Sequence, residues 1–165
     1  MRVPRLHCRG PVQRKLDQLP PDTHDYFVKL PGHDTLRLIL AKQAILVEGP
    51  SDELIVQRAF KDHHGVPALA RGVDVISVNS LAFKRFLQIA QRLDIKARVV
   101  TDNDGDVAVL QERYTDFLNY IYYDSDEDAP SLEQQLIKAN TLAQLNLVLD
   151  KTFADEAALL KFMKG

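Results

Sequence analysis

The sequence has a single cysteine, no long apolar run and almost no net charge, and each of these absences excludes a class of protein. The lone Cys8 excludes an internal disulfide and any zinc site built from several cysteines, and it fits a reducing cytosol. No apolar stretch approaches the length of a transmembrane helix, and the N-terminus lacks the apolar core of a secretory signal. We therefore expect a soluble, cytoplasmic chain with no membrane partner.

Net charge and length set broader limits. A net charge of −2 provides no overall positive field of the kind that attracts nucleic acid, although an acidic metal site would cancel basic patches in this sum. The 165 residues suffice for one domain with a real core, and 45% apolar and 27% charged residues are typical of a globular protein. We therefore expect one main domain.

Common ligand-binding motifs are also missing. The chain has no Gly-x-x-x-x-Gly-Lys-Ser/Thr pattern and therefore no P-loop for ATP. Segment 102–106 resembles the start of an EF-hand, but Val107 and Arg113 stand where that loop requires glycine and glutamate. It also differs from the Asp-x-Asp motif of haloacid-dehalogenase phosphatases, because it follows the third predicted strand and continues as Gly-Asp instead of Gly-Thr.

Two short apolar runs end abruptly in carboxylates. Ala44–Val47 ends in Glu48, and Ala97–Thr101 ends in Asp102 and Asp104. Runs this short suit strands of a parallel sheet, whose carboxyl ends share one edge. Carboxylates that meet there repel, so one must hold a proton or bind a cation. Oxygen ligands of this kind favour Mg²⁺ or Mn²⁺.

The order of elements predicts an α/β fold with a parallel sheet and right-handed crossovers. Helical spacing separates the expected strands, which are 44–47, 73–78, 97–101 and 119–123. The first long helix is expected to begin with Ser51 as its N-cap. A small helical addition follows from Ser131 to the end. The proline-rich stretch from Met1 to about Leu30 is interpreted as a loop-like leader, with Asp17, Asp22 and Asp25 as solvated loop charges.

Some acidic residues have a simpler structural explanation. Asp52 and Glu53 lie in the first turn of a predicted helix, where the helix dipole favours negative charge. Asp52 is four residues past Glu48 across a tight turn, so we favour a metal-ligand role for it and the dipole role for Glu53. Ser131 taken alone is explained as a helix N-cap.

Basic residues cluster on the predicted helix 81–93 and on the approach to the third strand. The simpler interpretation is a solvated face, and the alternative is one wall of a groove that binds the phosphate backbone of DNA. The candidates for DNA contact are Lys84, Arg85, Arg92, Lys96 and Arg98.

A strand ending in Glu48-Gly49, followed two strands later by Asp102-Asn103-Asp104, resembles the Toprim domain of topoisomerases, bacterial primases, recombination proteins and some nucleases. The segment from Glu48 to Glu53 and the segment Pro130–Glu133 are similar to the OLD (overcoming lysogenization defect) family of nucleases. This resemblance covers about residues 35–165. It implies a Rossmann-like Toprim catalytic domain over 35–165, with the helical addition from about 131, and residues 1–34 as a leader or the tail of a preceding domain.

The resemblance implies a metal-dependent DNA endonuclease or nickase that hydrolyses phosphodiester bonds with two ions of Mg²⁺ or Mn²⁺. One ion would be held by Glu48, Asp52, Ser131 and Glu133. The other would be held by Asp102 and Asp104, with a carboxylate bridging the two. Glu48 would also be able to take a proton from water.

The resemblance also implies partners outside this sequence. OLD proteins carry an N-terminal ABC-type ATPase domain, so we expect a longer ATPase–nuclease protein that is able to oligomerise. The family's late lysine is expected beyond Gly165, so cleavage by this chain is expected to be weak. The alternatives are a non-catalytic Mg²⁺-binding Toprim module that recruits partners, and a topoisomerase- or primase-type domain, for which no tyrosine here is marked as the nucleophile.

Overall fold

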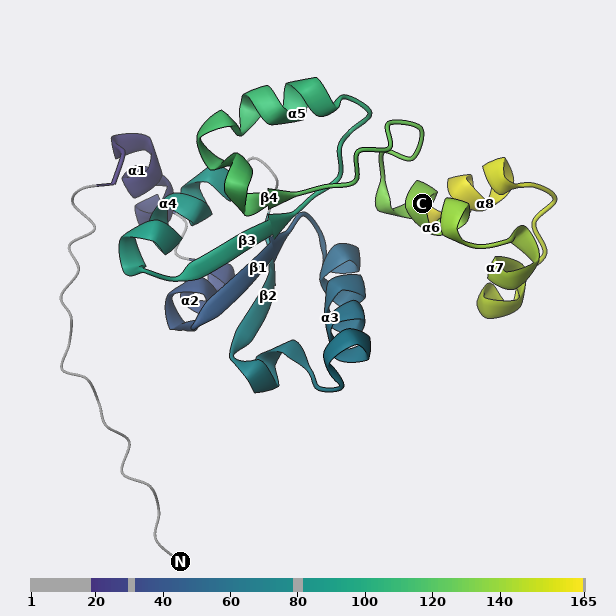
Figure 1. Cartoon of the computed structure of the whole chain (residues 1–165), viewed down its shortest axis with the longest axis horizontal. Helices are drawn as coiled ribbons and strands as arrows, with labels where there is room; N and C mark the ends of the chain where they lie inside the picture. The colour runs from purple at the N-terminus through teal and green to yellow at the C-terminus, as the bar shows by residue number, and fades with distance from the viewer. Residues whose placement is uncertain (1–18, 30–31, 79–81, 165) are drawn as a thin grey trace, which may run out of the picture.

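A four-stranded parallel sheet lies at the centre of the computed structural model, which describes residues 19–29, 32–78 and 82–164. The strand order is β2-β1-β3-β4 (Figure 1). The strands are β1 (Gln43–Val47), β2 (Val73–Ser77), β3 (Lys96–Val100) and β4 (Ile121–Tyr122). The structure confirms the predicted α/β fold, and the predicted fourth strand is shorter than expected because residues before Ile121 form a 3-10 helix.

The main hydrophobic core lies on one face of the sheet. Apolar side chains of α4 at helical spacing, including Phe83 and Leu87, pack there against Leu46 of β1 and Val99 of β3. The helices that contribute residues to this face are α1 (Pro21–Lys29), α2 (His33–Leu40), α4 (Phe83–Leu93), α5 (Val107–Arg113) and the 3-10 helix η4 (Thr115–Tyr120). This face therefore holds most of the buried apolar surface.

The N-terminal part of the described chain differs from the prediction. Residues 21–29, expected to be a loop-like leader, form α1, and Pro21 occupies its first turn, where a missing N–H costs nothing. Helix α1 packs on α4 through the rings of Phe27 and Phe86, whose centroids are 5.2 Å apart. Asp22 and Asp25 are exposed, as expected, but on a helix. The predicted boundary after residue 34 lies within α2, and residues 1–18 lie outside the described residues.

A smaller core occupies the opposite face, where α3 (Pro50–His64) and the 3-10 helix η2 (Ala68–Arg71) cover β1 and β2. Its buried members are Val47, Ala68 and Val75. The N-cap of α3 is Gly49 and not Ser51, which is exposed inside the first turn. The capping prediction was wrong because Pro50 already starts the helix, and Pro is favoured at the first helical position.

Strand β3 is buried on one face only. Lys96, Arg98 and Val100 are exposed on the α3 side, whereas Ala97 and Val99 are buried in the main core. Successive side chains of a strand point to opposite faces, so α3 leaves the β3 half of its face uncovered. Figure 1 shows this arrangement, with α3 lying beside β1 and β2.

The free edge of β2 is closed by side chains. Arg37 of α2 donates from Nη2 to the carbonyl of Val75 at 2.5 Å, and the N–H of Ser77 donates to Glu53 Oε2 at 3.2 Å. The same guanidinium pairs with Asp74 at 2.7 Å and with Glu53 at 3.1 Å. Glu53, which the sequence assigned to the helix dipole, is therefore also part of this network.

The C-terminal addition forms three short helices that extend beyond the sheet (Figure 1): α6 (Leu132–Ala139), α7 (Leu142–Leu149) and α8 (Glu156–Met163). Helices α6 and α8 each bury one apolar side chain, Ile137 and Leu159 respectively. Thr141 ends the α6–α7 connection by capping α7 in a capping box with Gln144. None of the helices in the described part of the chain has the length and apolar character needed to cross a bilayer.

Candidate metal centre

The sheet brings the predicted acidic residues to its topological switch point. From β1 the chain crosses to β2 on one side, and from β2 it returns to β3 on the other side. Ligands of open α/β sheets bind outside the carboxyl ends of the strands at such a point. Glu48 directly follows β1, and Asp102 follows β3 after Thr101. We call Glu48, Asp52, Asp102 and Asp104 the strand-end carboxylates.

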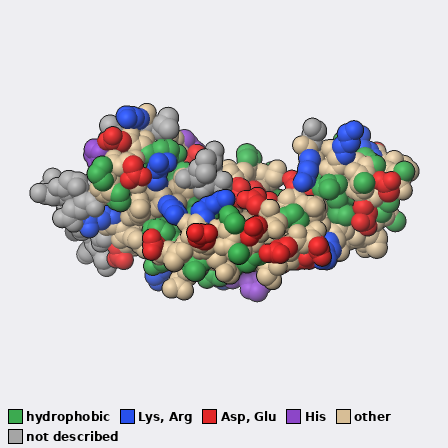
Figure 2. Space-filling model, turned by 90° about the horizontal axis from the view of Figure 1, so that it is seen from above, with side chains coloured by type: hydrophobic (Ala, Val, Ile, Leu, Met, Phe, Trp, Pro, Cys, Tyr) green, Lys and Arg blue, Asp and Glu red, His purple; other side chains and the backbone are tan. Residues whose placement is uncertain are grey.

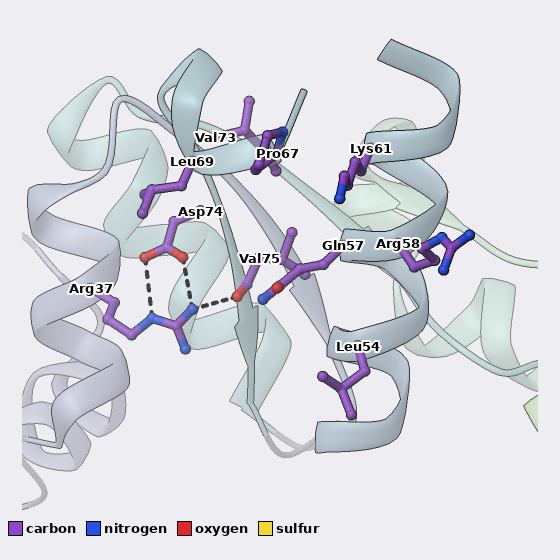
Figure 3. Close-up of a pocket in the computed structure, with 11 residues that line it drawn as sticks. Arg37, Leu54, Gln57, Arg58, Lys61, Pro67, Leu69, Val73, Asp74 and Val75 are labelled. Atoms are coloured by element: carbon purple, nitrogen blue, oxygen red, sulfur yellow. Dashed lines mark hydrogen bonds and ion pairs between the residues drawn. The ribbon is translucent and has the colours of Figure 1, made fainter. Parts of the chain in front are cut away.

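Two clefts of similar size lie on the α3 side of the sheet. The first, of about 550 Å³, is lined by Asp52, Thr101 and Asp102, together with residues of β4 and α6. The second, of about 450 Å³, lies beside β2, and Figure 3 shows its carboxylate, Asp74, held by Arg37. Because that carboxylate is already neutralised, the first cleft is the candidate site.

Glu48 is held by neighbours at the end of β3. The Thr101 hydroxyl donates a hydrogen bond to Glu48 Oε1, and the backbone N–H of Asp102 donates to the same carboxylate. Burial raises the pKa of Glu48, the Thr101 bond opposes this rise, and the charges of Asp104 and Asp52 add to it. Hydrogen bonds therefore fix the orientation of Glu48, while its acidic neighbours disfavour its charged form.

Asp52 and Asp102 both line the cleft and interact electrostatically. Asp52 accepts a hydrogen bond of 3.0 Å from the N–H of Gly49, which fixes it at the start of α3. Burial and the charges of Asp52 and Glu48 raise the pKa of Asp102 to about 6. A hydrogen bond from the backbone N–H of Leu132 opposes this rise. The first turn of α6 thus reaches the site.

Helix α6 places the two predicted ligands that lie far along the chain. Ser131 occupies the N-cap position, but its hydroxyl makes no capping bond. It donates instead to Glu133 Oε2 at 2.9 Å and to Gln134 Oε1 at 3.0 Å. The charge of Glu133 contributes to the raised pKa of Asp102, so Glu133 lies near the strand-end carboxylates.

A buried asparagine shapes the turn that presents Asp104. Asn103 is 0% exposed, donates to the carbonyls of Asp124 and Asp126, and accepts from the N–H of Gly105 at 2.7 Å. Asp104 and Gly105 have φ values of 55° and 81°, which aspartate tolerates and glycine favours. The Asp104 side chain is 69% exposed and lies 3.9 Å from Arg113 Nη1.

Glu48 interacts with all three of the other strand-end carboxylates. The charges of Asp104 and Asp52 raise its pKa, and its own charge contributes to the raised pKa of Asp102. The predicted division of ligands between two ions puts Asp102 with Asp104, and it stays a prediction. Figure 2 shows acidic side chains gathered across the middle of the molecule, where the body meets the C-terminal helices.

The chemistry of these donors fits a divalent cation. Within residues 19–29, 32–78 and 82–164, no group of three or more His, Cys, Asp or Glu side chains is arranged to hold a metal ion. The available donors are carboxylate oxygens and one hydroxyl, which suit Mg²⁺ or Mn²⁺. The raised pKa values of Glu48 and Asp102 have mutual repulsion among their causes, and a bound cation would relieve it.

The predicted basic residues lie on two faces of the sheet. Arg85 packs over the ring of Tyr26, and Lys84 lies 5.9 Å from the ring of Tyr114. Arg92, also on α4, lines a small cleft with Leu19. The other two, Lys96 and Arg98, lie on the opposite, open face of β3. The structure therefore does not bring the five together, and their contact with DNA stays a prediction.

Sequence reasoning missed two side chains that touch the strand-end carboxylates. Thr101 donates a hydrogen bond to Glu48, which lies 53 positions earlier in the sequence. The one sequence feature that pointed to this contact was a hydroxyl residue at the end of the predicted third strand. Arg113 approaches Asp104 because α5 folds back over the strand ends, and no local pattern marks that approach.

Residues 39–104 match the family model described as "Overcoming lysogenization defect protein-like, TOPRIM domain". The matched segment contains β1, α3, β2, α4 and β3 with all four strand-end carboxylates, whereas Ser131 and Glu133 lie outside it. No curated protein and no solved structure significantly matches the chain.

Proposed function

The chain carries a Toprim domain of the OLD family, and from this premise we propose that it is a metal-dependent DNA endonuclease or nickase that hydrolyses phosphodiester bonds with two divalent ions. A Toprim domain indicates metal binding and nucleic-acid chemistry at a coarser level. The observation that carries the finer proposal is the convergence of Glu48, Asp52 and Asp102 at the switch point of the sheet.

The contacts of each side chain in the site suggest its role in the proposed hydrolysis. Bound Mg²⁺ or Mn²⁺ would activate water and stabilise charge on the phosphoryl oxygens. The ligand set would be Glu48, Asp52, Asp102, Asp104, Ser131 and Glu133. Hydrogen bonds from Thr101 to Glu48 and from the Gly49 N–H to Asp52 hold these carboxylates in fixed directions. Preorganised ligands of this kind cost no reorganisation during the reaction. Glu48 would also accept a proton from water, since its raised pKa makes its carboxylate a better base.

Positive groups beside the cluster support a phosphodiester substrate. Arg113 lies 3.9 Å from Asp104 and is partly exposed, so it would contact a phosphate oxygen next to that carboxylate. Lys84 is exposed near Tyr114, a residue whose raised pKa reflects burial first and then the charges of Glu48 and Asp104. DNA is therefore the proposed partner, and an upstream ATPase domain is proposed for the full-length protein.

A strand-passage enzyme is the second candidate, and it needs an accessible tyrosine nucleophile close to the metal. Tyr114 does not meet this need, because it is 3% exposed and burial raises its pKa, which makes the phenolate harder to form. Tyr122 is exposed in the cleft that contains Asp52 and Asp102. Hydrolysis by activated water is preferred because it needs only the metal ligands and no tyrosine.

Nicking of supercoiled plasmid tests the proposal. The full chain should convert supercoiled to open-circular DNA with Mn²⁺ or Mg²⁺ and should be inactive in EDTA. Glu48→Gln should lower the rate by at least about 100-fold, because one preorganised electrostatic group is lost. Glu112→Gln on the exposed side of α5 is the matched control and should retain the rate.

Two results would contradict the proposal. One is equal nicking in EDTA and in Mn²⁺, and the other is full activity of Glu48→Gln. If the chain binds Mn²⁺ and leaves plasmid, linear and single-stranded DNA intact, the non-catalytic recruiting module replaces the nuclease.

A further inference from the structure

An exposed strip of sheet runs into the cleft of the strand-end carboxylates. Cross-strand neighbours in the register, Val100 and Tyr122, are 37% and 55% exposed on the α3 side. Both line the cleft that contains Asp52 and Asp102. Two residues before each of them in the sequence, the guanidinium of Arg98 on β3 lies 5.3 Å from the ring of Tyr120, the last residue of η4. We call Lys96, Arg98, Val100, Tyr120 and Tyr122 the open sheet face.

Charge and polarity change in order along the open sheet face. Lys96 and Arg98 lie at its start, and the exposed pair Val100 and Tyr122 lies in its middle. The carboxylates of Asp102 and Asp124 follow where the strands end. The strip is first basic, then aromatic, and then acidic, with donors for a cation. This order suits a nucleic acid strand, whose phosphates and bases would lie along the strip as the strand approaches a metal centre.

We propose that the open sheet face binds a single-stranded segment of nucleic acid and leads it to the strand-end carboxylates. This inference rests on the proposed nuclease function and names the form of its substrate. Lys96 and Arg98 would contact phosphates, and Tyr122 would stack on a base, since base–aromatic stacking and cationic contacts are how proteins hold single strands. In a duplex the bases are already stacked and paired, so Tyr122 reaches only an unpaired base.

The walls of the cleft favour a single strand over a helix of another protein. Ile55 and Val56 of α3 line one side, and Leu132 and Gln135 of α6 line another. An apolar helix docked here would cover Arg98 and the carboxylates of Asp52 and Asp102 without a partner for their charges, which is costly. A polyanion with bound divalent cations leaves none of these charges unpaired.

Binding without cleavage tests this proposal. Fluorescence anisotropy would follow the full chain with Ca²⁺ and a labelled 16-nucleotide oligothymidine or a 16-base-pair duplex. Tyr122→Ala should weaken oligothymidine binding by about 10- to 100-fold, as loss of one stacking ring does elsewhere. It should leave duplex binding unchanged. Tyr122→Phe keeps the ring and should restore most of the affinity.

A charge variant gives a second readout. Arg98→Ala should weaken oligothymidine binding and reduce the slope of log affinity against log salt by about 0.7, the value for one phosphate contact on a single strand. Arg58→Ala, which removes an exposed arginine paired with Asp62 on α3, is the matched control and should change neither quantity.

The proposal is overturned if Tyr122→Ala binds oligothymidine as well as the unmodified chain does, or loses duplex and single-strand binding equally. It is also overturned if the variant binds DNA normally but changes self-association by light scattering, which would identify a protein interface. Stacking at Tyr122 without any cleavage would uphold this inference and contradict the nuclease. Glu48-dependent nicking with no role for Tyr122 would do the reverse.

Discussion

Replacing Asp102 by asparagine should stabilise the metal-free protein while removing its response to metal. Asp102 is surrounded by Asp52, Glu48 and Glu133, and its ionised form is disfavoured by burial and by their charges. Asparagine has the same shape and can still accept the hydrogen bond from the Leu132 N–H. Asp102→Asn therefore removes a repelled charge without removing a structural contact.

The size of the stabilisation by Asp102→Asn follows from the pKa of Asp102. The folded protein raises the pKa of Asp102 from 3.8 to about 6, mainly through burial. A change of that size corresponds to about 3 kcal/mol, and solvent screening of a partly exposed carboxyl reduces it to about 1–2 kcal/mol. For a chain of this length, Asp102→Asn should raise the melting temperature in EDTA by about 3–6 °C.

The effect of Asp102→Asn should depend on pH. The folded-state pKa of Asp102 lies above the unfolded value, so the folded state holds the proton more tightly. The penalty is therefore complete above about pH 6 and fades as the pH falls toward 3.8. The gain in melting temperature for Asp102→Asn should be full at pH 7.5 and clearly smaller at pH 5.

Thermal unfolding with and without Mn²⁺ measures both effects. Mn²⁺ at 100 times its dissociation constant should stabilise the unmodified chain by about 2.7 kcal/mol, because it binds only the folded state. Asp102→Asn should lose most of this rise. Asp155→Asn, at the exposed N-cap of α8, is the control, and it should keep the rise and its EDTA melting temperature. A lower EDTA melting temperature for Asp102→Asn, or an undiminished Mn²⁺ response, would refute the reasoning.

Two other substitutions probe the sheet edge and the turn beneath the site. Arg37→Met should lower the free energy of unfolding by about 2–4 kcal/mol in urea, because Asp74 and Glu53 lose their shared cation. Arg58→Met should stay within about 0.5 kcal/mol, and equal losses for both would contradict this account. Asn103→Ala should cost about 2–3 kcal/mol and weaken the Mn²⁺ response, because two loop carbonyls lose their donor. An unchanged urea midpoint would show that the turn does not depend on Asn103.

The sequence was sufficient for features that depend on chain order. Glu48 and Asp102 end short apolar runs, and any parallel sheet containing both runs places the two carboxylates at one edge. The apolar residues of α4 stand at helical spacing in the sequence, and they form the buried side that packs on the sheet. These predictions needed only the period of strands and helices.

Features that depend on long-range packing were not predictable in this way. Residues 21–29 have few apolar side chains, and they form a helix because Phe27 and Thr23 find partners on α4. The approach of Arg113 to Asp104 depends on the path of α5, which no local pattern encodes. The exposure of Val100 and Tyr122 follows from which strands α3 covers, and that choice is made in three dimensions.

The side-chain closure of the β2 edge also constrains how copies of this domain can assemble. The carbonyl of Val75 and the N–H of Ser77 are already bonded to Arg37 and Glu53, so a strand from another molecule would have to displace these side chains to pair there. The opposite edge strand, β4, spans two residues and offers little to extend. Copies of this domain that associate would therefore meet through surfaces other than the two edges of the sheet.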